Sequence, residues 1–134
     1  MKLVEDKLTI EELINIADEQ CENEECRVCV AVADIETMAD IFDTMQQSMY
    51  VFCNMSLNKL EVKYSNGSRL CVLWVDENAC CTRGRRFDYV LMDSRFSDDA
   101  KRVIEAMAVR SIYFKLSNMQ FEDNRVNAIQ EFNI

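Results

Sequence analysis

The 134-residue chain has no proline, no histidine and only two glycines. Without proline there is no polyproline segment or Pro-rich linker, and because nearly half of the residues are apolar, no disordered tail is indicated. Without histidine the Ser-His and Cys-His pairs of nucleophilic catalysis are excluded, while a cysteine nucleophile with another base stays open. A chain of this length can bury a proper core, so we expect one domain over residues 1–134.

Long apolar runs are missing as well. Residues 1–6 lack the apolar core of a signal peptide, and no uncharged apolar run approaches the roughly 20 residues that a membrane helix needs. We therefore expect a soluble cytoplasmic protein with no membrane contact.

Cysteine is well represented, with seven copies. The number is odd, there is no secretion signal and most cysteines lie in apolar runs, so we expect free buried thiols instead of disulfides. Cys26 and Cys29 have a zinc-like spacing, but on a strand they point to opposite faces, and the adjacent Cys80 and Cys81 fit a four-ligand site poorly. The sequence therefore predicts no metal and no other cofactor.

The net charge of −9 is concentrated at the N-terminal end. Residues 1–45 contain 13 acidic against 3 basic side chains, whereas the remaining residues are nearly balanced. The negative electrostatic potential of this segment disfavours contact with nucleic-acid phosphates and favours a basic partner. The alternative is that these acidic residues only solvate the exposed face of a helix. The acidic residues that we expect to contact a partner are Glu11, Glu12, Asp18, Glu19, Glu22, Glu24 and Glu25.

The first half of the chain predicts a helix, a buried strand and a second helix. Thr9 and Glu12 form a capping box before apolar residues at helical spacing, which indicates a helix over residues 10–20. Residues 27–33 are apolar at successive positions, as in a strand that is central in a parallel sheet. Asp34 then caps a helix with an apolar stripe at positions 38, 41, 42 and 45.

The second half predicts mainly strands. After an apolar run over residues 49–55, the dipeptide Asn66-Gly67 suits the turn of a β-hairpin that spans residues 60–75. Residues 87–93 form the next strand, Ser97 caps a helix over 97–108, and residues 111–116 close the sheet.

Residues 118–134 are expected to form a short tail helix, through Val126, Ile129 and Phe132, that docks on the domain or on a partner. The element order predicts an α/β (or α+β) fold, with a single mixed sheet of about six strands flanked by three to four helices.

A basic turn that leads into an apolar strand with an acidic end is the most suggestive motif. Residues 83–86 read Arg-Gly-Arg-Arg, residues 87–93 end in Asp93, and an Asn-Gly-Ser turn lies upstream at 66–68. Over residues 26–116 this series resembles the middle of a phage terminase large-subunit or helicase-type ATPase core. The resemblance implies an α/β scaffold in which Asp93 corresponds to the residue that helps to hold Mg²⁺.

The sequence lacks two motifs of that family that ATP hydrolysis requires. A P-loop requires G-x-x-x-x-G-K-[ST], and neither Gly67 nor Gly84 begins or ends such a motif. Ser94 replaces the glutamate that polarises the attacking water in the resembled family. We therefore expect no ATPase activity. Either the chain is a degenerate core that keeps the scaffold without the chemistry, which is the preferred interpretation, or the likeness is chance convergence on a common α/β pattern.

Two alternative functions remain from the residue pattern. Arg69, Arg83, Arg85 and Arg86, together with Asp93, could bind phosphate, nucleic acid or a nucleotide at the end of the sheet, or the arginines could neutralise the acidic half of the chain.

The second alternative is a metal-dependent nuclease, because Glu61-Val62-Lys63 matches its E-x-K motif and places Glu61 and Lys63 on one face. An upstream aspartate is missing from residues 49–60, so two charges on the wet face of a hairpin explain the pair better.

The preferred hypothesis is a non-catalytic acidic interaction protein, of the phage or viral type. It would bind, and could inhibit, a basic nucleic-acid-processing partner such as a defence nuclease, by imitating phosphate charges or covering a site.

Overall fold

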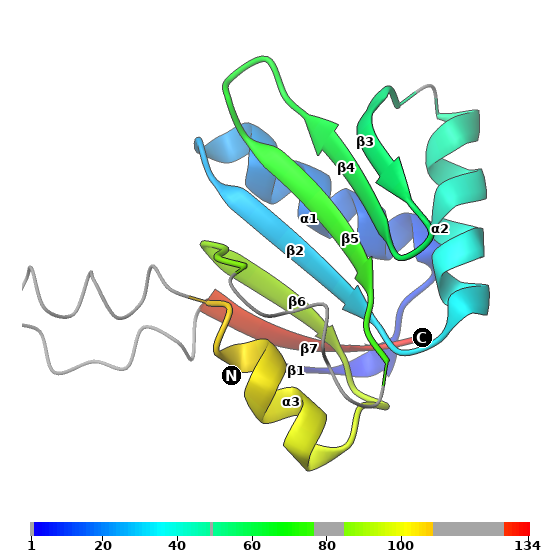
Figure 1. Ribbon diagram of the computed structural model, residues 1–134, viewed down its shortest axis with the longest axis vertical. Coiled ribbons are helices and arrows are strands. Elements are labelled where there is room, and N and C mark those ends of the chain that lie inside the picture. Colours follow the sequence, from blue (N-terminus) through cyan, green and yellow to red (C-terminus); the bar gives the residue numbers. More distant parts are fainter. Residues whose placement is uncertain (1, 49, 77–84, 109–127) are drawn as a thin grey trace, which may run out of the picture.

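A mixed β-sheet of seven strands forms the centre of the structure, a computed structural model that describes residues 2–48, 50–76, 85–108 and 128–134 (Figure 1). The strands are β1 (Lys2–Lys7), β2 (Arg27–Val32), β3 (Phe52–Ser56), β4 (Lys59–Lys63), β5 (Arg69–Trp74), β6 (Tyr89–Asp93) and β7 (Ile129–Asn133). The helices are α1 (Ile10–Asn23), α2 (Ile35–Gln47) and α3 (Asp98–Glu105). The predicted α/β class and the single mixed sheet flanked by helices are therefore confirmed.

The strand order across the sheet is β1-β7-β6-β2-β5-β4-β3. The first five strands in this order pair in parallel, and β4 is antiparallel to both β5 and β3. β2 lies in the middle, paired with β5 on one side and β6 on the other, as its apolar sequence predicts.

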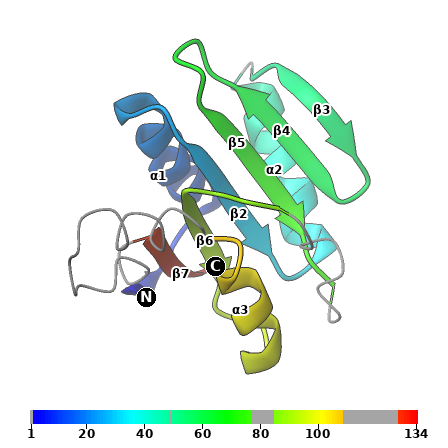
Figure 2. The same cartoon turned by 60° about the vertical axis from the view of Figure 1, so that its left-hand side comes forward.

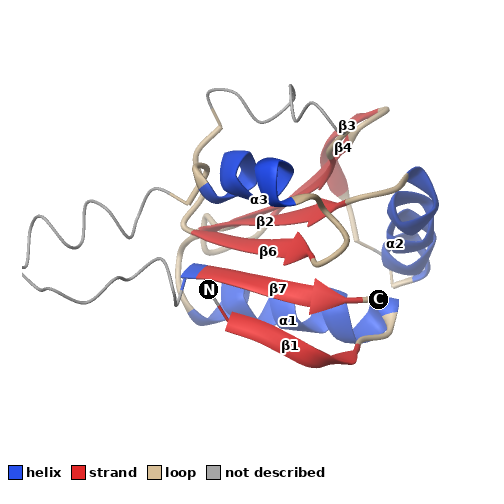
Figure 3. Ribbon diagram, turned by 90° about the horizontal axis from the view of Figure 1, so that it is seen from below, coloured by secondary structure: helices blue, strands red, loops and turns tan. Residues whose placement is uncertain are grey.

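Helices cover both faces of the sheet, as Figure 3 shows for α1 and α3. On one face Val28, Val30 and Val32 of β2 belong to a core cluster with buried residues of α1 and α2. On the other face Cys29 and Ala31 pack in a second cluster with buried residues of α3. Successive side chains of a strand point to opposite faces, so a strand that is apolar throughout requires both layers.

Each helix begins at the cap that the sequence predicts. The Thr9 hydroxyl accepts a hydrogen bond from the Glu12 N–H, and the Glu12 carboxylate accepts one from the Thr9 N–H. Asp34 accepts from the Thr37 N–H, and Ser97 accepts from the Ala100 N–H.

The predicted hairpin is also present, and its turn is attached to the end of α1. Gly67 has a φ of +93°, a conformation that other residues rarely adopt. The Asn66 side chain accepts from the Ser68 N–H and donates to the carbonyl of Cys21. The buried Ser68 hydroxyl accepts from the Cys26 N–H, so turn, helix and β2 are held together.

The prediction of a tail helix that includes Ile129 and Phe132 is wrong. Residues Ile129–Asn133 form β7, which is inserted in parallel between β6 and β1. Both apolar residues are buried, but on opposite faces of the sheet, one in each core cluster. Their spacing of three residues fits a helix and a strand covered on both faces equally well. Pairing with β6 and β1 in the sheet selects the strand.

Two other elements differ from the expectation. β1 has no clear signal in the sequence, because residues 2–7 contain four charged residues and show no apolar alternation. The predicted strand at 111–116 and residues 118–127 of the tail lie outside the described residues. No helix in the described ranges is long and apolar enough to cross a bilayer.

Of the five cysteines in the described ranges, Cys21 and Cys53 are free thiols. Cys21, Cys26, Cys29 and Cys71 are buried and Cys53 is exposed. Burial raises the pKa of the Cys21 thiol to about 12, so this thiol stays protonated and unreactive at neutral pH. No group of three possible metal ligands occurs among the described side chains.

A salt-bridge network fixes the carboxyl end of β6 to the start of α2. The fully buried Asp93 accepts hydrogen bonds from the Ala33 N–H at 3.2 Å and from the Arg95 guanidinium at 2.7 Å. Arg95 also donates to Asp34 at 2.7 Å and to Thr37 at 3.1 Å. Hydrogen bonds to Asp93 raise the pKa of Arg95, so it remains charged and compensates the buried carboxylate.

Replacing Arg95 tests this network. Arg95→Met leaves Asp93 buried without its guanidinium partner, and we expect the free energy of unfolding to fall by about 2–4 kcal/mol in urea denaturation. Arg102→Met removes an exposed ion pair with Asp99 on α3 and should cost less than about 0.5 kcal/mol. Equal losses for the two variants would contradict the proposed importance of the network.

Truncation tests the assignment of β7. A chain that ends before Ile129 loses a strand paired on both sides, together with the buried Phe132, so we expect loss of cooperative unfolding in circular dichroism. A truncated chain that unfolded with an unchanged midpoint would show that residues 129–134 are a dispensable tail.

Candidate functional site

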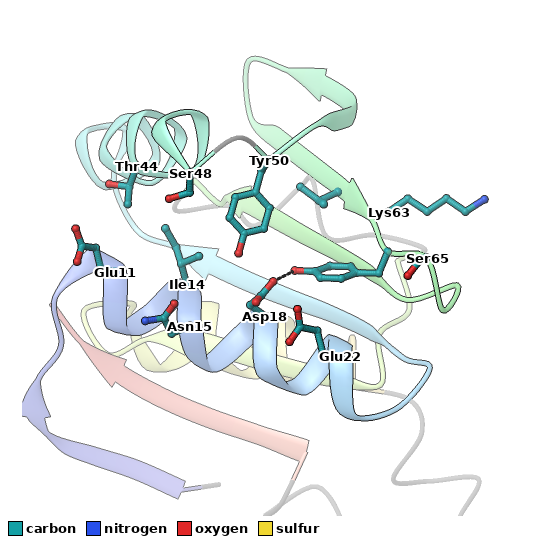
Figure 4. A pocket seen from close by; sticks show the side chains of 12 residues that line it. Glu11, Ile14, Asn15, Asp18, Glu22, Thr44, Ser48, Tyr50, Lys63 and Ser65 are labelled. Atoms are coloured by element: carbon teal, nitrogen blue, oxygen red, sulfur yellow. Dashed lines mark hydrogen bonds between the residues drawn. The ribbon is translucent and has the colours of Figure 1, made fainter.

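A cleft of about 730 Å³ lies between α1, the end of α2 and the end of β4 (Figure 4). It is lined by Glu11, Ile14, Asn15, Asp18, Glu22, Thr44, Ser48, Tyr50, Val62, Lys63, Tyr64 and Ser65. Its size lies within the range of about 300–1,000 Å³ that is typical of ligand pockets. We call it the acidic cleft.

The helical repeat of α1 places the acidic side chains in the cleft. Glu11, Asn15, Asp18 and Glu22 recur at intervals of three or four residues and therefore form one stripe along the helix. The adjacent stripe of Leu13, Ile14, Ala17 and Cys21 is buried against the sheet. The acidic stripe consequently lies at the border between core and solvent, beside the opening of the cleft.

Asp18 and two tyrosines form the centre of the cleft. The Tyr64 hydroxyl donates to Asp18 Oδ1 at 2.6 Å, and the Tyr50 phenol points toward the same carboxylate (Figure 4). Burial raises the pKa of Tyr64 and of Tyr50, and the neighbouring Asp18 raises both further. Both phenols therefore stay protonated, and the Asp18 carboxylate keeps acceptor positions that Tyr64 does not use.

The charges of the cleft are unbalanced. Glu11, Asp18 and Glu22 supply three carboxylates, and Lys63 is the single basic residue of the lining. In Figure 4 the Lys63 side chain extends away from these carboxylates. An open, partly apolar cleft with this lining attracts a cation and repels phosphate.

The seven acidic residues predicted to form one partner-binding face are divided by the structure. Glu11, Asp18 and Glu22 line the cleft, whereas Glu12 is occupied in the capping box. Glu19 and Glu25 are exposed outside the cleft lining.

Glu24 serves the fold. Its carboxylate accepts hydrogen bonds from Gln20 and from the Tyr89 hydroxyl at the start of β6, and so ties the end of α1 to the sheet.

The predicted phosphate contacts do not converge. Arg85 and Arg86 precede β6, whereas Asp93 ends it, so they lie near opposite ends of this strand, roughly 20 Å apart. Both Asp93 oxygens are engaged by Arg95, and Arg69 pairs with Glu61 at 2.6 Å. Arg83 lies outside the described residues.

Glu61 and Lys63 lie on β4 as alternation predicts, away from the buried Leu60 and Val62. Glu61 is bound by Arg69 at 2.6 Å and Lys59 at 3.6 Å, so its neighbours are cations. These ion pairs explain the presence of Glu61 as one of several charged residues on the surface of the sheet.

The sequence alone does not identify the tyrosines of the cleft. Tyr64 fits the apolar alternation of a strand and Tyr50 an apolar run, so neither stands out from the core residues. Their approach to Asp18 depends on contacts across about 30 to 45 positions of sequence, for which no local signal exists.

Comparison with known proteins gives no further guidance. No protein-family model matches the sequence, and no curated protein matches it significantly.

The pair Tyr64–Asp18 gives a prediction for stability and its pH dependence. Tyr64→Phe removes a hydrogen bond to a carboxylate, so we expect a loss of about 1–2 kcal/mol in unfolding free energy at pH 7. Because the folded pKa of Tyr64 is raised above its ordinary value of 10.0, its stabilisation is complete below pH 10 and declines as the pH rises further.

The wild type should therefore lose stability between pH 10 and 11 more steeply than Tyr64→Phe in urea titrations. Parallel curves for the two proteins would contradict a role for this phenol.

Proposed function

We propose that this protein acts by binding, and that the acidic cleft holds basic side chains of a partner protein. The observation that carries the proposal is the grouping of three carboxylates and two phenols around an open cleft. Carboxylates accept the donors of guanidinium and ammonium groups, and a tyrosine ring can also accept a cation on its face.

Arginine suits this cleft better than lysine. The guanidinium group is planar, carries five donors and is weakly hydrated, so it can bind Asp18 or Glu22 while it stacks on a phenol ring. The cleft volume exceeds that of one side chain, so a basic segment, and not a single residue, fits the site.

A partner with such a segment is a protein that itself handles nucleic acid. When the partner's basic segment occupies the cleft, its side chains can no longer contact nucleic-acid phosphates. Binding would therefore inhibit a nucleic-acid-processing partner. The acidic stripe of α1 provides the long-range attraction, which salt weakens.

The test uses an oligo-arginine peptide as a probe and measures its affinity by calorimetry. The variant Glu11→Gln/Asp18→Asn/Glu22→Gln keeps the shape of the cleft and removes its charge, since the amide oxygen introduced at position 18 would still accept from Tyr64. We expect at least roughly tenfold weaker binding, because three contacts of about 0.5–1 kcal/mol each are lost.

A matched control changes the same net charge elsewhere. Glu36→Gln/Asp40→Asn/Asp43→Asn alters three exposed acids of α2, none of which lines the cleft. Its affinity should stay within about twofold of the wild type. Equal weakening by both triple variants would show general attraction without a site. Tight binding of duplex DNA by the isolated protein would instead favour the alternative in which Arg69, Arg83, Arg85 and Arg86 bind nucleic acid.

A further inference from the structure

The edge strand β3 is largely exposed, since four of its five residues are exposed. β3 is the outermost of the described strands and pairs with β4 alone (Figure 2). Alternate N–H and C=O groups on its other side therefore point away from the sheet. The opposite edge strand, β1, has four charged residues in its six, a common protection against pairing with other chains.

β3 has the reverse composition. No charged residue occurs between Asp43 and Lys59, although 29% of the chain is charged. Three large apolar side chains in this stretch are exposed: Val51 and Leu57 at 81% each, and Met55 at 59%. An exposed edge strand that combines apolar side chains with the absence of charge is suited to pairing.

We propose that β3 is the interface of a homodimer, in which the β3 strands of two copies pair antiparallel about a two-fold axis. Two antiparallel copies of one edge strand present the same groups to each other, so the interface is self-complementary. The two seven-stranded sheets then form one continuous sheet.

Charge identifies a second copy as the occupant. Each chain carries a net charge of −9, so two copies repel each other over most of their surfaces and least at an uncharged edge. An uncharged edge offers no ion pairs to a basic partner, and none of the residues that line the acidic cleft belongs to β3. The proposed dimer interface thus shares no residue with the proposed binding site.

The two interactions have opposite salt dependence. Salt screens the repulsion between like-charged copies, so dimerisation strengthens as ionic strength rises, whereas binding of a basic segment weakens. Failure of one proposal can therefore be distinguished from failure of the other.

Light scattering on the full chain tests the dimer. At roughly 100 µM, where a complex of micromolar Kd is largely formed, we expect twice the single-chain mass of 15.6 kDa. Met55→Lys places a charge on the pairing strand and, separately, Leu57→Lys places one in the turn that directly follows it; each should return the mass to that of one chain. Val103→Lys changes another exposed apolar residue, 43% exposed on α3, and should remain dimeric.

Cross-linking provides a second readout. Cys53 is the one exposed thiol among the described cysteines and lies on β3, so a flexible bis-maleimide should link two chains through it, and Cys53→Ser should lose that product. A wild-type chain that is monomeric at this concentration overturns the proposal, as does a dimer that survives both lysine variants.

Discussion

The structure depends on covering both faces of β2. Its side chains are apolar at every position after Arg27, so neither face can be left in water. α1 and α2 cover one face and α3 covers the other, with β5 and β6 on its two sides. The need to bury both faces of β2 determines the layered architecture, and the positions of the remaining elements follow from it.

The acidic cleft is a consequence of that packing. Because α1 buries one stripe against the sheet, the neighbouring stripe with Asp18 comes to lie at the border of the core, where Tyr64 reaches it from the strand end. A carboxylate held beside phenols at a border is still open to water, yet its geometry is fixed. Such preorganisation reduces the ordering cost of binding a cationic side chain.

The two proposed surfaces use charge in opposite ways. In the proposed roles, the cleft would attract a partner of opposite sign, whereas the edge strand would allow association because charge is absent from it. A dimer through β3 would present two clefts, and two linked sites raise the apparent affinity for a partner with repeated basic segments. Association of the chain and capture of its partner would thus reinforce each other without any shared residue.

Local chemistry made much of the fold predictable. Thr9, Asp34 and Ser97 begin helices because their side chains satisfy free N–H groups nearby, and Asn66-Gly67 turns because glycine accepts a positive φ. The burial of β2 on both faces likewise follows from its own residues.

The prediction of a tail helix failed because local sequence was ambiguous there: Ile129 and Phe132, at a spacing of three residues, fit a helix and a strand alike. By itself the sequence determined most of the element types, their caps and the acidic character of α1, because these depend on neighbours a few residues away. Only the tertiary structure decided that the last residues complete the sheet, that Asp93 is taken by Arg95, and that Tyr50 and Tyr64 meet Asp18. These contacts depend on how the sheet and its helices pack, which no short stretch of sequence specifies.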